Sequence, residues 1–425
     1  MEGWAEARVR DGRDAIEIKP AIQRRLEPIT QRLRKSVPLG RNQFFVPLDF
    51  DPSGKFLWGY TDRSAAALDL ERGRIDAKIE WPAEPRVLRV ELSADKRELF
   101  VGRAGMKPEQ VVSDGKTKTV HRQTGRLDAY DLKTGRKLPT FDGREPGSIF
   151  NIAASSDGKW LAFNERRKIA ETSETSFRTV LWDLASNRSV EVGSTHVDLV
   201  ISPDSSQLFA NDFNTATKES TLFRWTIPNP KSTTIATAKD AVLYTPEFSR
   251  DGRWMVLRRS PLGRKTPMEL ELWDRTQNRV VATATQDAEN LSHAVFDPKG
   301  RWLVLVDAAT GVRLLDLTNN SLNKAFDLPR KSTIWTPSFS PDGSRLALIA
   351  NDFTNANIKS SDADAFDQPT LWLVDMSRPT QPERAVLPPG PSSQFVWSPD
   401  GTTIVARGMG RMLILNATNV NSAKP

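Results

Sequence analysis

The sequence contains no cysteine among its 425 residues. Disulfide bonds, thiolate zinc sites and a cysteine nucleophile are therefore excluded. Apolar residues nowhere form a run of 18, the length that a helix needs to cross a bilayer, so we expect no transmembrane segment. The N-terminal residues MEGWAEARVRDGRDAIEIK also lack the apolar core of a secretory signal, which predicts a cytoplasmic location for the chain as it stands.

Motifs for several kinds of catalysis are missing as well. The sequence has no Gly-x-Ser-x-Gly elbow, no phosphate-binding loop and no dinucleotide fingerprint. Its three histidines, His121, His196 and His293, are far apart in the sequence, which argues against an imidazole metal site. The acidic residues 361–367 lack the glycine and the terminal glutamate of a Ca²⁺ loop. We therefore predict no cofactor and no metal, and we favour a non-catalytic protein over an enzyme.

The net charge of +7 is concentrated near the N-terminus. Residues 19–41 carry seven basic residues against the single acid Glu27, and the remainder of the chain is close to neutral. Apolar residues recur there at helical spacing, which predicts a short basic helix at about 20–35. That helix either packs on the body of the protein or lets residues 19–41 bind nucleic acid, an anionic membrane or an acidic protein.

A four-residue turn signal recurs eight times, at intervals of 42 to 62 residues. Sequences such as SPDG and SSDG suit tight turns, because Asp bonds its own backbone and Gly accepts a positive φ. Polarity alternates before each turn and two consecutive apolar columns follow it, which predicts a strand on either side. The eight turns end at Gly54, Lys96, Gly158, Ser205, Gly252, Gly300, Gly343 and Gly401.

Each of these eight rows continues with a third strand, ending for example in LWD at Asp183, and with a fourth segment such as RVVATA from Arg279. The pattern predicts an all-β fold, a single β-propeller of eight blades with four antiparallel strands each, or seven blades if one row is incomplete. We place the propeller in residues 42–425, after an N-terminal basic segment, 1–41. A ring must cover its sheet edges, so we predict that residues 15–18 supply the fourth strand of the last blade.

Two short stretches point to a known family. Residues 340–343 read SPDG and residues 181–184 read LWDL, and both resemble the marks of the WD-repeat β-propeller family. The resemblance covers about residues 42–416 and is to divergent propellers of bacterial type, because the Gly-His pair that opens a typical repeat is missing. It implies the propeller fold, and it also implies a possible place within a larger signalling protein, where similar bacterial propellers often occur.

The connection between the second and third strands is longer than its minimum in rows two, three, four, five and seven, which predicts loops on one face of the ring. Two of these loops begin almost identically, with ANDFNTATK at 210–218 and ANDFTNANIK at 350–359. Their phenylalanines either pin the loop or face a partner. Rows two and five are basic and row seven is acidic, a pattern that orients a polar partner. The predicted partner-binding residues are Arg103, Lys107, Lys116, Lys118, Arg122, Arg126, Arg258, Arg259, Arg264, Lys265, Phe213 and Phe353.

Three functional hypotheses follow. The first is a non-catalytic scaffold that binds a protein partner through these loops. The second is a propeller enzyme or small-ligand binder that uses carboxylates and arginines around the central channel. The third is a sensor or interaction part of a larger signalling protein. A broad face favours the first hypothesis, and a deep channel with converging carboxylates favours the second.

Overall fold

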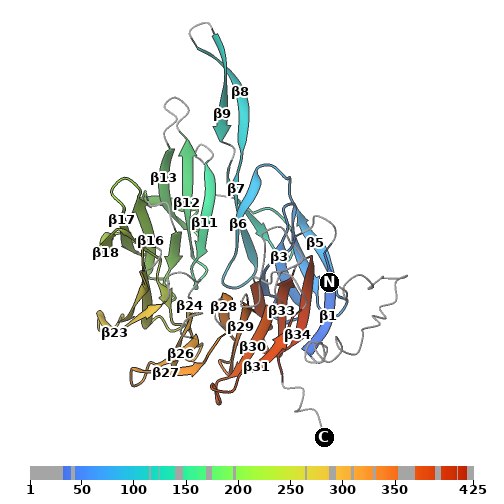
Figure 1. The fold of residues 1–425 in the computed structure, drawn as a ribbon. Helices are drawn as coiled ribbons and strands as arrows, with labels where there is room; N and C mark the ends of the chain where they lie inside the picture. Colours follow the sequence, from blue (N-terminus) through green and yellow to red (C-terminus); the bar gives the residue numbers. More distant parts are fainter. Residues whose placement is uncertain are drawn as a thin grey trace, which may run out of the picture.

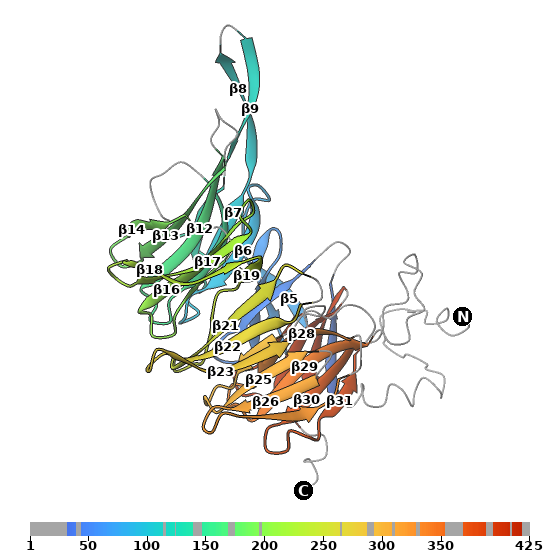
Figure 2. The same cartoon turned by 60° about the vertical axis from the view of Figure 1, so that its left-hand side comes forward.

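The computed structural model describes residues 32–39, 44–113, 116–123, 125–138, 147–168, 175–194, 198–263, 266–286, 293–307, 311–328, 332–352, 369–387, 394–408 and 410–418. Every named element in these ranges is a β-strand. Within them no helix is long and apolar enough to cross a bilayer. The described strands form nine antiparallel sheets, and eight of these lie around a common axis as the eight predicted blades (Figure 1, Figure 2). Seven blades have the predicted four strands or a divided version of them, and blade two has three described strands.

The first four blades follow the order of the sequence rows. Blade one is β2 (Val46–Phe50), β3 (Phe56–Tyr60), β4 (Ser64–Asp69) and β5 (Arg74–Glu80). Blade two is β6 (Arg86–Leu92), β7 (Glu98–Ala104) and β10 (Leu127–Asp131). Blade three is β11 (Ser148–Ala154), β12 (Trp160–Lys168), β13 (Thr175–Asp183) and β14 (Arg188–Gly193). Blade four is β15 (Asp198–Ile201), β16 (Gln207–Asn214), β17 (Glu219–Thr226) and β18 (Ser232–Lys239).

The other four blades repeat the arrangement. Blade five has a divided first strand, β19 (Ala241–Leu243) and β20 (Glu247–Phe248), then β21 (Trp254–Pro261), β22 (Met268–Asp274) and β23 (Arg279–Gln286). Blade six is β24 (His293–Phe296), β25 (Trp302–Asp307), β26 (Gly311–Asp316) and β27 (Ser321–Phe326). Blade seven is β28 (Ser332–Phe339), β29 (Arg345–Asp352), β30 (Pro369–Asp375) and β31 (Glu383–Val386). Blade eight is β32 (Gln394–Trp397), β33 (Thr403–Gly408), β34 (Arg411–Asn416) and β1 (Leu33–Pro38).

The closing strand of blade eight comes from the N-terminal part of the chain. β1 pairs antiparallel with β34, and Val37 on β1 is buried between blades eight and one. The prediction that residues 15–18 fill this position was wrong, because β1 already pairs with the edge of β34; residues 15–18 themselves lie outside the described residues. The propeller therefore begins before residue 42.

The prediction of a helix at about 20–35 is also wrong for its last three residues. Residues 33–35 belong to β1, and residues 20–31 lie outside the described ranges. In β1 the side chain of Leu33 packs against the core of blades seven and eight, while Arg34 and Ser36 are exposed. The period of two and the unpaired edge of β34 outweigh the helical spacing of the preceding residues.

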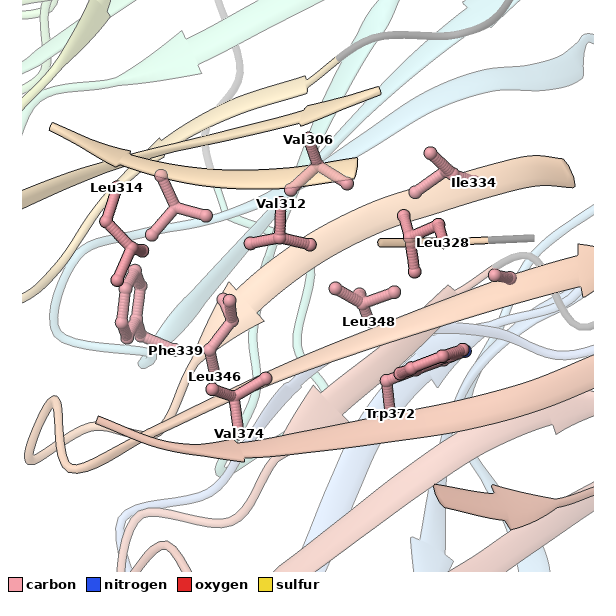
Figure 3. Close-up of a cluster of buried hydrophobic side chains, with 12 residues drawn as sticks. Val306, Val312, Leu314, Leu328, Ile334, Phe339, Leu346, Leu348, Trp372 and Val374 are labelled. Atoms are coloured by element: carbon pink, nitrogen blue, oxygen red, sulfur yellow. The ribbon is translucent and has the colours of Figure 1, made fainter. Parts of the chain in front are cut away.

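Apolar packing closes the ring. Eight clusters of buried side chains occur among the described residues, one at each interface between neighbouring blades, including the interface between blades eight and one. Figure 3 shows the cluster between blades six and seven, where Val306, Val312 and Leu314 face Leu348, Trp372 and Val374. The second strands of blades five and six, β21 and β25, have runs of consecutive buried residues and so are covered on both faces, which explains the consecutive apolar columns of the sequence.

The turn signal has one structural role in all eight blades. In blade five the Oγ of Ser249, fully buried, accepts a hydrogen bond from the Trp254 N–H (2.9 Å) and donates one to Asp251 Oδ1 (2.6 Å). Gly252 ends the turn with φ of 71°. The backbone N–H at the start of the second strand is bonded in the same way by Ser93, Ser155, Ser202, Ser340 and Ser398, and by Asp51 and Asp297 in the two blades without serine.

The insertions predicted as loops are largely longer strands. In blade four, β16 and β17 pair from Gln207 and Thr226 out to Asn214 and Glu219, so the ANDF sequence is part of a hairpin. In blade seven the corresponding sequence ends β29 at Asp352, and Phe353 lies outside the described residues. Because each blade has the same strand order, these hairpins point to one end of the ring, which we call the hairpin end.

Candidate interaction surface

The longest insertion forms a ribbon of its own in blade two. β8 (Met106–Ser113) and β9 (Lys116–Gln123) pair along their whole length, from Met106 opposite Gln123 to Ser113 opposite Lys116. They form a separate two-stranded sheet, joined to no other described strand. Figures 1 and 2 show this ribbon projecting from the hairpin end, beyond the tips of the other blades.

The register divides the ribbon into two unlike faces. Residues opposite one another share a face, and faces alternate along each strand. Lys107 opposite Arg122, Val111 opposite Lys118 and Ser113 opposite Lys116 belong to one face, which therefore holds all four of the ribbon's basic positions. The other face is free of Lys, Arg, Asp and Glu, and its described side chains are exposed: Met106, Pro108, Gln110, Val112, Thr117 and Thr119.

A buried charge cluster lies at the root of the ribbon. Arg103, on β7, and Asp128, on β10, are both fully buried, and Arg103 Nε lies 2.7 Å from Asp128 Oδ2. Arg103 Nη1 also donates to the carbonyl of Pro85 (2.9 Å), and its guanidinium lies over the Trp81 ring. The strands from which the ribbon leaves blade two are thus tied together directly at its base.

Two further cations reach Asp128 from the solvent side. Arg126 Nε lies 2.9 Å and Lys137 Nζ 2.7 Å from Oδ1, and both side chains are about half exposed. Burial raises the pKa of the Asp128 carboxyl, but hydrogen bonds from Lys137 and Arg126 outweigh burial and hold the pKa below its usual range. Asp128 is therefore a fully satisfied carboxylate that binds three cations at the root of the ribbon.

Close backbone packing completes the root. A Cβ at Gly125 would meet the carbonyl oxygens of Gly147 and Arg103, so only glycine fits where the chain re-enters blade two. A Cβ at Gly147 would likewise meet the buried side chain of Glu165. Glu165 in turn pairs with Arg178 and, at 3.1 Å, with Arg167. Blades two and three thus meet tightly beneath the ribbon.

A groove of about 630 Å³ opens beside this root. It lies between the start of β8 and the first two strands of blade three. Arg86 and Arg166 line it, are exposed, and form no ion pair with a described carboxylate. The complete lining is Glu84, Pro85, Arg86, Ala104, Gly105, Met106, Pro108, Ser148 and Arg166.

The structure separates the predicted partner-binding residues. Lys107, Lys116, Lys118 and Arg122 lie on the ribbon, and Arg126 lies at its root. Arg103 was predicted on the surface and is instead buried, because it is the partner of Asp128.

Of the residues predicted in blades four and five, those that the structure describes do not join this surface. Arg258 is mostly buried and pairs with Glu247, at 2.6 Å, while Arg259 is half exposed. Phe213 is half-buried on β16. The remaining three residues lie outside the described ranges: Arg264, Lys265 and Phe353.

Arg86 and Arg166 were missed from the sequence. Arg86 lies in a first strand, outside any insertion, and Arg166 lies in the lengthened second strand of row three, whereas the charges were compared only in rows two, five and seven. Two signals exist. Arg86 opens a first strand directly after the sequence EP, and Arg166 lies in a run of three basic residues at the end of β12.

Comparison with known proteins supports the fold and nothing finer. No family model matches the sequence, and no curated protein matches it. The structure is similar to the C-terminal WD40 domain of Sif2, with a TM-score of 0.58 and 13% identity over 91% of this chain and 99% of that chain. The chain has the WD40 β-propeller fold.

Two weaker similarities were also found. One is to the β-propeller domain of Cps50 (Swd1) from Myceliophteria thermophila, with a TM-score of 0.45 and 14% identity over 78% of this chain and 97% of that chain. The other is to hydrazine synthase of Kuenenia stuttgartiensis, with a TM-score of 0.46 and 15% identity over 79% of this chain and 96% of that chain.

The first strands of the WD40 propeller carry three titratable groups with shifted pKa values. Burial raises the pKa of Glu91 and of Glu247, each against a nearby arginine. Burial lowers the pKa of His293, whose Nε2 lies 3.2 Å from the Ile334 carbonyl oxygen. In the described part of the chain, no three His, Asp or Glu side chains gather in a group that could hold a metal ion.

Proposed function

We propose that this WD40 propeller is a non-catalytic interaction scaffold that binds a protein partner at its hairpin end, with the ribbon β8–β9 as the main docking element. The observation that carries the proposal is the ribbon itself. A two-stranded sheet is at best marginally stable alone in water, yet this one is hydrogen-bonded to no other described strand. A partner that covers it would supply the missing contacts.

Two further observations support a protein partner. One face of the ribbon exposes apolar side chains, with Val112 at 70% and Met106 at 48% exposure. The buried Arg103–Asp128 pair holds the root in place, so the ribbon presents itself from a fixed base. Propellers of the WD40 fold commonly act as protein-interaction scaffolds, and the fold alone does not name the partner.

The test is a photo-crosslinking experiment in cells of the native source. A crosslinking amino acid replaces Val112 or Thr117 on the ribbon, or, as a control, exposed Leu322 on β27 in blade six. We expect one protein to be captured at both ribbon positions and not at Leu322. The purified partner should then bind the intact chain and lose binding when residues 106–123 are replaced by a short Gly-Ser linker, with the melting temperature unchanged. If the partner binds the intact chain and the linker variant equally well, the proposal is refuted.

A further inference from the structure

The groove at the root of the ribbon differs from its surroundings in its charges. Five neighbouring cations are already paired: Arg103, Arg126 and Lys137 with Asp128, and Arg167 and Arg178 with Glu165. Arg86 and Arg166 face no such partner among the described residues, and Glu84 is the one acid in the groove lining. The groove therefore holds two guanidinium groups that form no ion pair with a described carboxylate, beside the single acid Glu84. Guanidinium groups bind carboxylates well because of their planar donor geometry.

The groove also borders an open strand edge. β8 pairs with β9 on one side, and no other described strand pairs with the backbone donors and acceptors of its outer edge. Met106 and Pro108, at the start of β8, are part of the groove lining and are exposed. An extended peptide laid along this edge gains main-chain hydrogen bonds and places alternate side chains toward the groove.

The chemistry of the lining favours a peptide over nucleic acid. Single-stranded nucleic acids are held by aromatic stacking platforms together with a long basic track. The groove lining contains no aromatic side chain, and its apolar part consists of proline, alanine and methionine. Two arginines are few for a phosphate backbone but match two carboxylates of one peptide.

We propose that this groove binds an extended acidic segment of a partner protein, laid along the outer edge of β8 with its carboxylates at Arg86 and Arg166. This inference rests on the proposed scaffold function and adds the chemistry of the partner. It makes Arg86 and Arg166 specificity-determining residues, although they lie outside the ribbon.

The experiment measures fluorescence anisotropy of labelled probes with the full-length chain. The probes are an eight-residue peptide of alternating Glu and Val, the matching Lys and Val peptide, and an oligothymidine of eight nucleotides. The test variant is Arg86→Glu with Arg166→Glu. The control variant is Arg188→Glu with Arg250→Glu, which changes the charge equally through two exposed arginines on the turns at the opposite end of the ring. Thermal melts confirm that both variants are folded.

We expect the intact chain and the control variant to bind the acidic peptide, and the test variant to bind it at least about tenfold more weakly, because each charge-assisted hydrogen bond contributes substantially. The test variant should instead prefer the basic peptide. Equal weakening in the control variant, tighter binding of oligothymidine than of the acidic peptide, or no binding of the acidic peptide to the intact chain would each overturn the inference.

The crosslinked partner separates the two proposals. If it binds the test variant as tightly as the intact chain, the acidic-segment inference fails and the scaffold function stands. If no partner depends on the ribbon, the scaffold function fails as well. Loss of the partner from the test variant, with the control variant unaffected, supports both.

Discussion

Arg103 and Asp128 are both fully buried, and they join the two strands between which the ribbon β8–β9 is inserted. The guanidinium donates further hydrogen bonds to two backbone carbonyls and lies against Trp81, while the carboxylate is shared with Arg126 and Lys137. A buried charge of this kind is tolerated only while all its partners are present. The pair therefore couples the stability of blade two to the position of the ribbon.

Removing the carboxylate should be costly. We expect Asp128→Asn to lower the free energy of unfolding by about 3 to 5 kcal/mol, because it leaves the charge of Arg103 buried without a counterion. Urea denaturation monitored by tryptophan fluorescence measures this loss.

Two controls test the explanation. Arg126→Ala, which removes a half-exposed partner of the same carboxylate, should cost only about 1 kcal/mol or less. The double variant Arg103→Met with Asp128→Leu should recover much of the stability lost in Asp128→Asn. The explanation is wrong if Asp128→Asn costs no more than Arg126→Ala.

The serine of the turn signal offers a second prediction. We expect Ser249→Ala to lower the free energy of unfolding by about 1 to 3 kcal/mol, because the buried N–H of Trp254 loses its acceptor. Blade one shows how the chain replaces this serine: Asp51 accepts from the Phe56 N–H, and Ser53 donates to Asp51.

A double substitution that exchanges the serine and the aspartate of this turn tests the role of the hydrogen bond. Ser249→Asp combined with Asp251→Ser copies the arrangement of blade one and should be more stable than Ser249→Ala in the same urea titration. If the double variant is less stable than Ser249→Ala, the hydrogen bond from the Trp254 N–H is not what stabilises the turn.

The fold could be predicted because its information is local and repeated. A serine or aspartate that opens the turn, a residue with positive φ that ends it and the flanking apolar columns recur in every row, and each has a direct physical role in the structure. If the strands of one row are misplaced in the sequence alignment, the other seven rows, which repeat the same pattern, show the error. The number of blades and their strand order follow from that repetition.

The candidate site could be predicted only in part, because its features depend on contacts between segments distant in the sequence. Nothing near Arg103 in the sequence indicates that Asp128, 25 residues away, will bury it. The sequence LRKSVP of β1 becomes a strand only because β34 offers an unpaired edge. Arg86 and Arg166 meet in one groove because two blades are adjacent. Such placements need the packed structure.

Low pH should destabilise the turn between the first two strands of blade seven. Asp342 accepts hydrogen bonds from Ser340 and Ser344, which lower its pKa to about 2 although burial opposes them. Its folded-state pKa lies below the usual value, so its stabilising contribution is present above about pH 4 and is lost as the pH falls from about 4 towards 2. We expect Asp342→Asn to melt at a lower temperature than the parent at pH 7, with the difference shrinking towards pH 3. The control is Asp62→Asn, which removes the charge of an exposed aspartate. If the difference in melting temperature between Asp342→Asn and the parent is the same at all pH values, the Asp342 carboxylate does not stabilise the turn in this way.

Ring closure by β1 gives the last prediction. Val37 is 4% exposed in the cluster between blades eight and one, whereas Ser36, its neighbour on the same strand, is exposed. Val37→Asp buries an unpaired charge at the interface that closes the ring, so we expect a loss of roughly 4 kcal/mol or more in the free energy of unfolding. Ser36→Asp introduces the same charge on the solvent face of β1 and should change stability by about 0.5 kcal/mol or less. Both substitutions sit in one strand and have equal charge, so only burial separates them. Equal stability of the two variants in urea would mean that β1 does not hold blades eight and one together.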